Sequence, residues 1–527
     1  MYLQVEFALV LTDMKFIYKI FARPLLIDFP LFLLIVILTT FPKAICELMY
    51  DYEIKVVVWD FLHTYIICYL LLFFIHLLKG KFLRVARNFV LALAFIDFAI
   101  EIACIKVLGT YFYEDMVAIV CGTNLNEVKE FISTYFSLNI IFIIIVTLIS
   151  SFFFLKVFGK WLQKYSRNFV PVFLSTAIIS FSILTYKKSE SWSCAYIAKY
   201  ITLLKYELPP DLRSQPKPKV VLNGDIPDFI VMVLGESFTK FHSSLYGYEK
   251  MTNPLLDKLK MDSLLLMCDG VQAPATTTIE CFKSIMSTYQ QNYRDSVNWY
   301  ECAALPNIMS SIGYNTIWIS NQSSSGIYDN IATRYSELCD STIFVGNKLL
   351  GMSKLDYDEE VIFPLCNFNF NKDEKYFIVV HLIGSHYEFS KRYPVSRSYF
   401  KVDNYNDKEE KQRKNLSDYD NSVLYNDSVV YEIFNLFEEK EVLGLYFPDH
   451  GIDLYESSTS YFGHAIKTNS QSVHISRQIP FMMYCSSELK LKYPSIIDKA
   501  QLIYSDNFCT ENIINSFLDI LNISILE

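Results

Sequence analysis

Charged residues are scarce in this chain, and several kinds of biased sequence are missing from it. Only 20% of its 527 residues are Asp, Glu, Lys or Arg, and the mean hydropathy is +0.24. A composition of this kind argues against a wholly soluble protein. The sequence has no internal repeat and no Gly/Ser-rich tract. The formal net charge of −9, without a basic and aromatic stripe, gives no indication of nucleic-acid binding.

Apolar residues are concentrated in the first third of the chain. Five stretches are each long enough to cross about 30 Å of hydrocarbon as a helix. They lie near residues 24–46, 56–78, 85–107, 131–155 and 169–186. A basic, mixed stretch precedes the first of them, and no small-residue cleavage site follows, so we interpret it as a retained anchor. We therefore predict a membrane domain of five helices over residues 1–186.

Basic residues in the connecting segments predict how these spans are oriented, because Lys and Arg favour the cytoplasmic side. They precede the first span, join the second to the third and join the fourth to the fifth: Lys15, Lys19, Arg23, Lys79, Lys81, Arg84, Arg87, Lys156, Lys160, Lys164 and Arg167. The segment from Gly109 to Lys129 carries acidic residues instead. With an odd number of spans, everything after about Tyr186 is expected outside the cytoplasm.

A few ionisable residues fall inside the apolar stretches. They are Asp28, Asp60, His63, Asp97 and Glu101. Ionisable groups within a membrane span are functional candidates, but the same residues could lie near span ends and reach the interface. Both interpretations stay open from the sequence.

The rest of the chain divides into a connecting segment and a larger domain. Over residues 187–225, aromatic residues typical of a membrane surface come first and four prolines follow, which predicts an interfacial segment and a stiff linker. A short helix packed on the larger domain is the alternative for the first part. From residue 226 to 527, apolar strands alternate with amphipathic stretches, including runs at 317–319, 377–381 and 479–484. This alternation predicts an α/β domain with a mostly parallel sheet.

Eight of the 12 cysteines lie in the exported part, where disulfides are permitted. They are Cys194, Cys268, Cys281, Cys302, Cys339, Cys366, Cys485 and Cys509. The sequence does not give their connectivity, and Cys281 with Cys302 is one candidate pair.

Two apolar runs of this domain end in residues that bind metal ions. The run 229–234 is followed by Glu236, and the run 442–447 is followed by Asp449 and His450. Both runs are typical of buried strands, whose carboxyl ends meet at one edge of an α/β sheet. Carboxylate oxygens and imidazole nitrogens are suitable ligands for zinc or a similar divalent ion. We therefore predict that these three residues converge on one cation.

Three consecutive threonines, Thr276–Thr278, precede a helical pattern over Ile279–Tyr289. A hydroxyl at a helix N-terminus is surrounded by backbone N–H groups that can hold a phosphate. Coordination to a divalent metal would withdraw its proton and make it a nucleophile. Taken alone, such a run is more typical of a helix N-cap. Only its combination with Glu236, Asp449 and His450 favours a nucleophile.

Histidine usage is the second indication of a catalytic centre. Five of the eight histidines cluster around the ends of two predicted strands: His381, His386, His450, His464 and His474. A lone histidine is usually structural. This concentration indicates a centre that handles phosphate charge through metal ligands, general acids or oxyanion donors.

These residues lie within longer phrases that, in this order, resemble the bacterial phosphoethanolamine transferases. The phrases are Val233-Leu-Gly-Glu-Ser237, Tyr246-Gly-Tyr248, Thr252-Asn-Pro254, Trp318-Ile-Ser-Asn-Gln322, His381-Leu-Ile-Gly-Ser-His386, Tyr419-Asp-Asn-Ser422 and Asp449-His-Gly451. That family consists of inner-membrane enzymes of the sulfatase and alkaline-phosphatase superfamily, with five spans followed by an exported domain. The resemblance therefore covers the whole chain and implies a sulfatase-like fold for residues 226–527.

The resemblance implies a role for each matching residue of the metal centre. Glu236, Asp449 and His450 would bind a catalytic zinc ion together with the nucleophilic threonine. Thr278 matches that threonine because Ser287 stands nine positions further on, where the family has a small or polar residue. Thr277 is the alternative. One zinc site is expected, and a second is left open.

The remaining matches imply contacts with phosphate and donor. His386 matches a phosphate-contacting histidine, His381 is its partner, and Asn321 matches a polar residue of the donor pocket. A further histidine beyond the Asp-His-Gly phrase would correspond to His464 or to His474.

The chain departs from the family's pattern at two places. Ile452 stands where the family usually has Glu, with Asp453 one position further, which puts a second metal or an outer contact of the centre in doubt. No lysine occurs between Gln322 and Tyr328, where some members carry one. Phosphate charge must therefore be balanced differently.

The resemblance implies a transferase that moves phosphoethanolamine from phosphatidylethanolamine to lipopolysaccharide, on lipid A or the inner core, through a covalent threonine intermediate. It would lie in the bacterial inner membrane with its catalytic domain in the periplasm. Two alternatives stay open: a phosphoglycerol transferase of the lipoteichoic-acid-synthase or glucan-modifying type, and an inactive membrane-anchored binding protein. A sulfatase is disfavoured, since its oxidised Cys or Ser motif is not apparent at the nucleophile.

Overall fold

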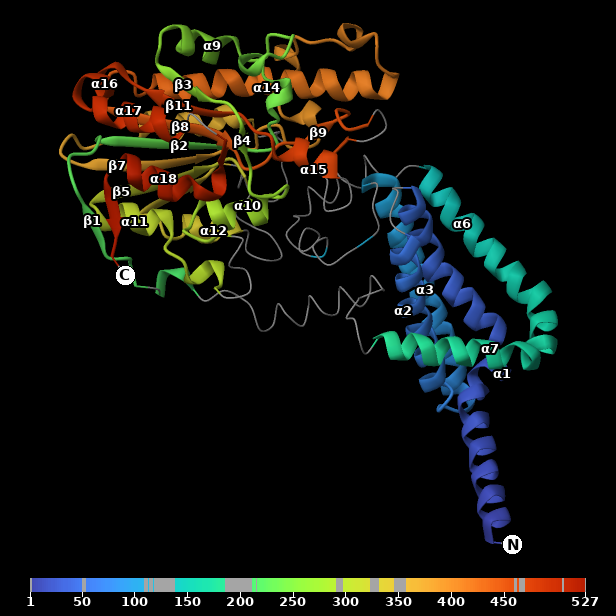
Figure 1. Ribbon diagram of the computed structural model, residues 1–527. Coiled ribbons are helices and arrows are strands. Elements are labelled where there is room, and N and C mark those ends of the chain that lie inside the picture. Colours follow the sequence, from blue (N-terminus) through green and yellow to red (C-terminus); the bar gives the residue numbers. More distant parts are fainter. Residues whose placement is uncertain are drawn as a thin grey trace. The chain divides into compact units, whose positions relative to one another are not determined.

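The computed structural model divides the chain into two compact units, one built mainly from residues 1–208 and the other mainly from residues 209–527 (Figure 1). It describes residues 2–49, 54–108, 112, 117, 138–184, 211–214, 216–290, 297–322, 331–345, 357–458, 462–463, 470–504 and 507–526. Three subjects of sequence predictions lie outside these residues: His464, Cys194 and the interfacial segment before the linker.

Long helices make up the N-terminal unit. They are α1 (Tyr2–Met49), α2 (Ile54–Ile75), α3 (Gly80–Leu108), α6 (Leu138–Phe153) and α7 (Gly159–Leu184), with a π-helical turn at Phe154–Phe158. Within the described residues, three helical stretches are long and apolar enough to cross a membrane: Ile20–Cys46, Gly80–Lys106 and Leu138–Ser166. Two shorter apolar stretches are Phe61–Ile75 and Asn168–Ala177. The prediction of five spans is therefore not confirmed, since three of the five predicted stretches qualify within the described residues.

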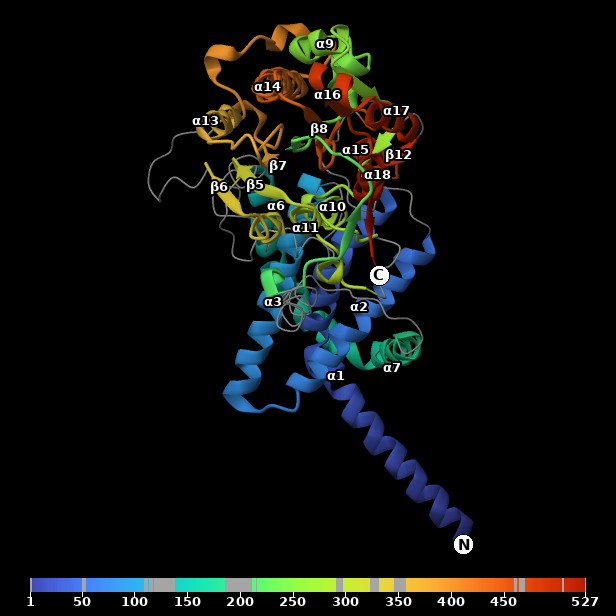
Figure 2. The same cartoon turned by 90° about the vertical axis from the view of Figure 1, so that its left-hand side faces the viewer.

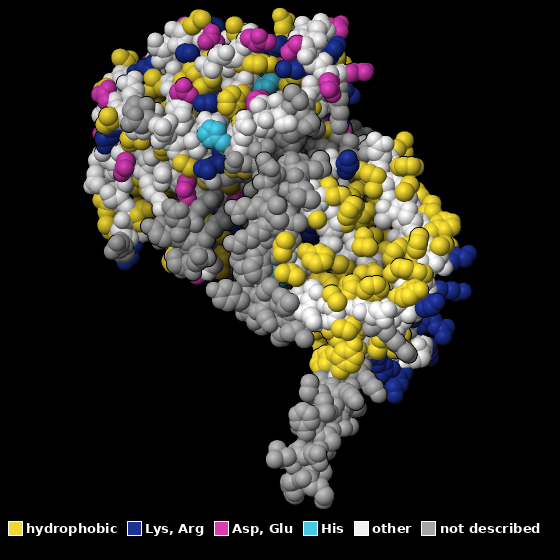
Figure 3. All heavy atoms as spheres, turned by 45° about the vertical axis from the view of Figure 1, so that its right-hand side comes forward, with side chains coloured by type: hydrophobic (Ala, Val, Ile, Leu, Met, Phe, Trp, Pro, Cys, Tyr) yellow, Lys and Arg dark blue, Asp and Glu magenta, His cyan; other side chains and the backbone are white. Residues whose placement is uncertain are grey.

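Exposed apolar side chains cover much of the visible face of this unit, and Lys and Arg side chains gather along one border of it (Figure 3). The apolar helix α6 illustrates the pattern, since Phe142, Ile149 and Phe152 are all exposed. Apolar residues at these positions cannot be explained by packing within the unit. They fit a surface that faces lipid.

Two of the ionisable residues within the apolar stretches form buried ion pairs between helices. Asp28 accepts hydrogen bonds from Arg87 Nη2 at 2.6 Å and from His76 Nε2 at 2.8 Å. Helix α1 departs from helical geometry at Asp28 (φ −124°, ψ 32°), two residues before Pro30, whose ring cannot continue the hydrogen-bond ladder. Glu101 lies 3.4 Å from Lys43. These charges are compensated inside the helix bundle.

The C-terminal unit is built on a seven-stranded sheet with the order β3-β11-β8-β2-β7-β5-β6 (Figures 1 and 2). Its strands are β2 (Phe229–Gly235), β3 (Leu265–Cys268), β5 (Tyr314–Ser320), β6 (Ser341–Phe344), β7 (Lys375–His381), β8 (Val442–Pro448) and β11 (Phe481–Cys485). The five apolar runs named from the sequence are thus strands of one sheet.

The sheet is mixed, which corrects the prediction of a mostly parallel sheet. All neighbouring pairs from β8 to β6 are parallel, whereas β11 is antiparallel to both β8 and β3. An apolar run shows that a strand is buried but carries no signal of its direction. The direction depends on how the connection returns to the sheet, which the sequence of β11 does not contain.

Alternation along the strands builds one apolar core on each face of the sheet. In β2, Ile230, Met232 and Leu234 pack on one face, while Val231 and Val233 pack on the other. The first core is completed by α10 (Thr278–Ile285), α11 (Leu305–Ser311), α12 (Ile331–Ser336), α16 (Ser487–Lys492), α17 (Pro494–Ile503) and α18 (Ile513–Ile520). The second is completed by α9 (Pro254–Met261), α13 (Ile362–Asn367) and α14 (Glu410–Asn435).

Shorter elements border the main sheet. Three two-stranded pairs form from β1 (Val220–Leu222) with β13 (Ile523–Ile525), β4 (Val271–Gln272) with β12 (Phe508–Cys509), and β9 (Asp453–Leu454) with β10 (Phe462–Gly463). Helix α15 (Ser470–Arg477) precedes β11. The cysteines of the described segments are all free thiols, so the candidate pair Cys281 and Cys302 is not a disulfide here. Cys281 is fully buried in α10 and packs as an apolar residue.

Candidate metal centre and active site

Two neighbouring parallel strands deliver the first two residues of the site. Strands β2 and β8 pair with Gly235 opposite Pro448, so the next residues, Glu236 and Asp449, leave the sheet side by side. The backbone N–H of Asp449 donates to the carbonyl of Gly235 at 3.2 Å and holds the two strand ends together. Both carboxylates are buried, with 2% and 0% of their residue surface exposed.

Thr278 comes from the opposite direction, as the first residue of α10. Its hydroxyl donates to Glu236 Oε2 at 3.1 Å and lies 3.3 Å from Nε2 of His450. Thr277 precedes the helix with an extended backbone (φ −136°, ψ 143°). The start of α10 therefore carries the Thr278 hydroxyl to the carboxylate and imidazole that follow β2 and β8.

The imidazole of His450 is oriented by its own backbone. Its Nδ1 lies 2.9 Å from the carbonyl oxygen of Gly451, which can only accept a hydrogen bond, so Nδ1 carries the proton. In the neutral ring, Nε2 then presents a lone pair. That atom lies 3.3 Å from Glu236 Oε1 and 3.4 Å from Asp449 Oδ2. It therefore points into the space that the carboxylates share.

The electrostatics of this group favour a bound cation. Ligand atoms of Glu236, Asp449 and His450 all lie within 4.8 Å of one another. Burial raises the pKa of Glu236 to about 7, and the charge of Asp449 adds to the effect. Burial likewise raises the pKa of Asp449 to about 6. Asp449 Oδ2 is buried without a hydrogen-bond partner among the described residues. Two carboxylates, a lone pair and a hydroxyl in this arrangement fit a divalent ion such as zinc.

The segment that follows β2 supports the Glu236 carboxylate. Ser237 adopts a left-handed backbone (φ 55°), and its hydroxyl donates to Glu236 Oε1 at 2.8 Å. The Tyr419 hydroxyl, on α14, donates to the Ser237 carbonyl at 2.8 Å and accepts from the N–H of Thr239 at 2.9 Å. This strained turn is therefore clamped to α14 by a single tyrosine.

A buried carboxylate that the sequence analysis missed organises the loop after β7. Asp358 accepts hydrogen bonds from the side chains of Asn321 and Asn426, each at 3.0 Å. It also accepts from the backbone N–H groups of Ile383 and Gly384, each at 2.8 Å. Asn321, the expected donor-pocket residue, thus binds Asp358. No motif marks Asp358, and only the fold reveals it.

Gly384 lies directly against Glu236. Its φ is +58°, and a Cβ there would stand 2.7 Å from both the nitrogen and the carbonyl oxygen of Glu236. The neighbouring N–H of Ser385 donates to the Glu236 carbonyl at 3.0 Å. The loop after β7 therefore fixes the backbone of Glu236, as Tyr419 fixes that of Ser237 and Thr239.

The two histidines of this loop differ in their surroundings. His386 is partly buried, and burial lowers its pKa while the charge of Glu236 opposes the shift, which places it within electrostatic reach of the centre. Its Nδ1 donates to the Tyr387 carbonyl at 2.8 Å. His381 is instead a core residue between Phe282 and Trp318, with ring centroids 5.0 and 5.9 Å away. Burial lowers its pKa to about 3, so its imidazole is neutral.

The residues beyond the Asp-His-Gly phrase have structural surroundings. Ile452 is 1% exposed and packs in the core beside α14. The carboxylate of Asp453 accepts from the N–H groups of Glu456 and Ser457 and so stabilises the turn after β9. His474 is exposed on α15. The departure at Ile452 therefore places an apolar side chain where a carboxylate was expected.

A model of one protein family, described as Sulfatase, matches residues 228–523. The chain belongs to the sulfatase family. The matched range begins just before β2 and ends at β13, so it contains every residue of the metal centre.

Curated relatives of this sulfatase-family chain are named phosphoethanolamine transferases. Phosphoethanolamine transferase EptC of Escherichia coli (strain K12) is 26% identical over 424 residues, which cover 73% of this chain and 71% of the relative. Phosphoethanolamine transferase CptA of Salmonella typhimurium is 27% identical over 425 residues, with the same coverage. The resemblance derived from the motifs is confirmed, and so is the prediction of an enzyme of the transferase class.

Solved structures agree with this grouping. The C-terminal periplasmic domain of E. coli EptC, in complex with Zn, is 26% identical, covers 59% of this chain and 87% of that one, and gives a TM-score of 0.52. The integral membrane lipooligosaccharide phosphoethanolamine transferase A of Neisseria meningitidis covers 94% of this chain and 95% of that one, with a TM-score of 0.65. At 17% identity, the second comparison establishes the fold alone. Both units of the chain therefore have counterparts in one solved fold.

The contact between Gly384 and Glu236 predicts a specific defect. In Gly384→Ala, the new methyl group should displace Glu236, and zinc affinity should fall about 10-fold, as is typical when the support of a ligand is lost. Gly247→Ala is the matched control, because Gly247 also has a positive φ (+94°) but nothing within 4 Å of its Cβ position. Both variants should lose about 1 kcal/mol from backbone strain. Equal zinc affinities in a chelator competition would contradict the prediction.

The raised pKa values of Glu236 and Asp449 predict the pH dependence of the metal-free protein. Their stabilising contribution is complete below their ordinary pKa values and is lost as the pH rises through about 6 and about 7, because ionisation is disfavoured in the folded state. After chelation, the free energy of unfolding should fall by on the order of 6 kcal/mol between about pH 4 and pH 8, about half of it from each carboxylate. Melting curves should show a smaller fall in Glu236→Gln. A fall of equal size in that variant would refute the assignment.

Proposed function

We propose that this protein is a phosphoethanolamine transferase of the bacterial inner membrane, with its catalytic domain in the periplasm and Thr278 as its nucleophile. The observation that carries the proposal is the position of the Thr278 hydroxyl, 3.1 Å from Glu236 and 3.3 Å from His450 at the start of α10. The names of the relatives support the group that is transferred. We take phosphatidylethanolamine as the donor.

The proposed reaction has two displacements at phosphorus. In the first, Thr278 Oγ1 attacks the phosphorus of phosphatidylethanolamine, and its proton passes to Glu236 Oε2, to which it is already hydrogen-bonded. The bond to the diacylglycerol oxygen breaks, diacylglycerol takes up a proton, and phosphoethanolamine stays on Thr278. In the second, an acceptor hydroxyl or phosphate attacks the same phosphorus and restores the threonine.

The residues around Thr278 match the charge that develops in these steps. Zinc held by Glu236, Asp449, His450 and Thr278 would lower the pKa of the hydroxyl and neutralise phosphate charge. The first N–H groups of α10 would be available to a phosphate at Thr278. His386, whose Nδ1 donates to the Tyr387 carbonyl, would donate from Nε2 to a phosphate oxygen in its protonated form, which the charge of a bound phosphate favours. His381 would act only through packing, since it lies in the core between Phe282 and Trp318.

The acceptor is proposed to be lipopolysaccharide, on lipid A or the inner core. Donor and acceptor are then both membrane lipids, and the apolar helices of the N-terminal unit would hold the enzyme at the same surface. Tethering of this kind raises the effective concentration of the active site at lipid headgroups. The basic connecting segments support an orientation in which Lys79 and Lys156 face the cytoplasm.

Thr278→Ala should abolish the covalent adduct that forms when the purified full-length protein is incubated with labelled phosphatidylethanolamine. Intact-protein mass spectrometry would detect the adduct. Thr277→Ala is the control and should retain it, because Thr277 lies one position before the helix. Undiminished labelling of Thr278→Ala would sink the assignment of the nucleophile. Labelling by phosphatidylglycerol in place of phosphatidylethanolamine would instead favour a phosphoglycerol transferase.

The acceptor is tested separately in cells. Mass spectra of lipopolysaccharide should show added phosphoethanolamine when the protein is present and lose it in the Thr278→Ala strain. Identical spectra from the two strains would contradict lipopolysaccharide as the acceptor while leaving the adduct chemistry intact.

A further inference from the structure

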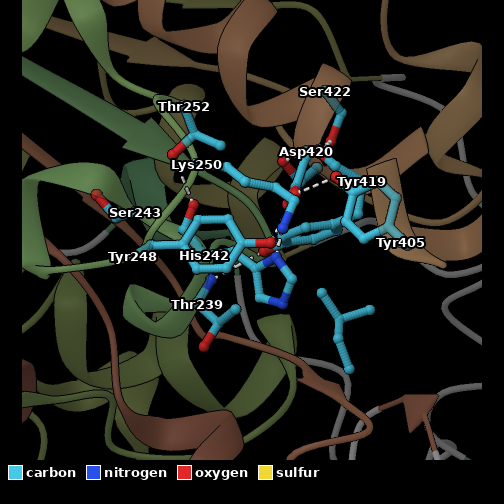
Figure 4. Close-up of polar contacts among 12 residues, drawn as sticks. Thr239, His242, Ser243, Tyr248, Lys250, Thr252, Tyr405, Tyr419, Asp420 and Ser422 are labelled. Atoms are coloured by element: carbon cyan, nitrogen blue, oxygen red, sulfur yellow. Dashed lines mark hydrogen bonds and ion pairs between the residues drawn. The ribbon is translucent and has the colours of Figure 1, made fainter. Parts of the chain in front are cut away.

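A second buried polar cluster surrounds His242, in the short 3₁₀ turn Lys240–His242 that follows Glu236. His242 Nδ1 donates to Asp420 Oδ1, on α14, at 2.6 Å, and Nε2 donates to Glu456 Oε1 at 3.2 Å. The residue is 5% exposed. Figure 4 shows the ring between Tyr248 and the α14 residues Tyr419 and Asp420. The cluster does not include any residue of the metal centre.

An imidazole with a carboxylate at each nitrogen donates from both only when it is protonated. Burial acts to lower the pKa of His242, but Asp420 and Glu456 raise it to about 9. Asp420 also accepts from the hydroxyls of Tyr248, at 2.7 Å, and Tyr405. His242 is therefore an imidazolium at neutral pH.

The other aromatic and charged groups near the His242 ring leave its ion pairs with Asp420 and Glu456 in place. Tyr248 and Tyr419 face it with their rings, at centroid distances of 4.6 and 5.2 Å. Asp453 lies beyond Glu456 in the turn after β9. The ammonium of Lys250 stands over the ring of Tyr405 at 4.7 Å and over that of Tyr248 at 5.6 Å.

Both carboxylates belong to segments that carry metal ligands or hold them. His242 lies at the end of the short segment that starts at Glu236. The Tyr419 hydroxyl holds this segment through its hydrogen bonds with Ser237 and Thr239. Glu456 lies in the turn that follows Asp449 and His450. The protonated side chain of His242 thus joins the segment after β2, the segment after β8 and helix α14.

We propose that His242 is a positioning residue of the metal centre: through Asp420 and Glu456 it fixes the segment that carries Glu236 relative to the one that carries Asp449 and His450. The inference rests on the metal centre of the proposed function. It adds the ion pairs of His242 with Asp420 and Glu456, called the ionic joint below, which lie outside the set of metal ligands. Loss of the joint lets the two ligand-bearing segments move apart and weakens the binding of the ion.

The test compares zinc affinities of full-length variants in detergent, measured by competition with a chelator. His242→Gln removes the charge, and Glu456→Gln removes one partner at a position that keeps 22% of its side chain exposed. Each should lower zinc affinity about 10-fold or more. The double variant should lose little beyond His242→Gln alone, because both changes break the same joint.

Two controls separate positioning from general stability. Asp427→Asn removes another buried carboxylate of α14, which accepts from the N–H groups of Leu255 and Leu256 at the start of α9. It should lower the melting temperature of the chelated protein without changing zinc affinity. His474→Gln, at an exposed histidine, should change neither.

The outcomes are distinct. Unchanged zinc affinity in His242→Gln and Glu456→Gln, or an equal loss in Asp427→Asn, would overturn the positioning role. Should His242→Gln fail to fold, the milder Glu456→Gln decides in the same assay. Zinc binding without a phosphoethanolamine adduct in the unmutated protein would contradict the proposed function alone. An unmutated protein that binds no zinc would overturn both.

Discussion

The structure of the site depends on the repulsion between two buried carboxylates that the sheet forces together. Glu236 and Asp449 follow neighbouring parallel strands whose last residues are paired, so their separation is set by strand spacing and cannot relax. Burial keeps water from screening them. A bound cation would resolve this conflict, and the lone pair of His450 and the hydroxyl of Thr278 lie where they could share it. Every other feature of the centre restrains these four side chains.

Those restraints share one design, in which buried acids accept several hydrogen bonds from loops. Asp358 accepts hydrogen bonds from two side-chain amides and two backbone N–H groups, and so orders the loop that contacts Glu236. Asp420 accepts hydrogen bonds from His242 and from the hydroxyls of two tyrosines. A carboxylate can accept from several directions at once, so each one fixes several segments. The irregular backbone around the site is ordered in this way without a larger apolar core.

Sequence reasoning predicted the strands, and it predicted that Glu236, Asp449 and His450 lie close together, for physical reasons. Strand β2 is apolar on both faces, and β8 is the same, so their ends were visible as the first polar residues after each run. It failed where long-range geometry decides. Nothing in the run at 479–484 indicates that β11 is antiparallel, because the direction of a strand depends on how the chain returns to the sheet. Asp358 stands outside every motif and acquires its role only when β5, β7 and α14 meet.

His381 illustrates how position outweighs residue type. The histidine closes β7 in a phrase that indicates phosphate chemistry, yet its ring is enclosed by Phe282 and Trp318. With a pKa of about 3, the His381 imidazole carries no charge near neutral pH. His381 therefore does not change its protonation state near neutral pH. An inflection near pH 7 in a plot of rate against pH has to come from other groups. In the proposed reaction, the proton that leaves Thr278 therefore passes to the Glu236 carboxylate and not to the His381 imidazole, which packs against Phe282 of α10.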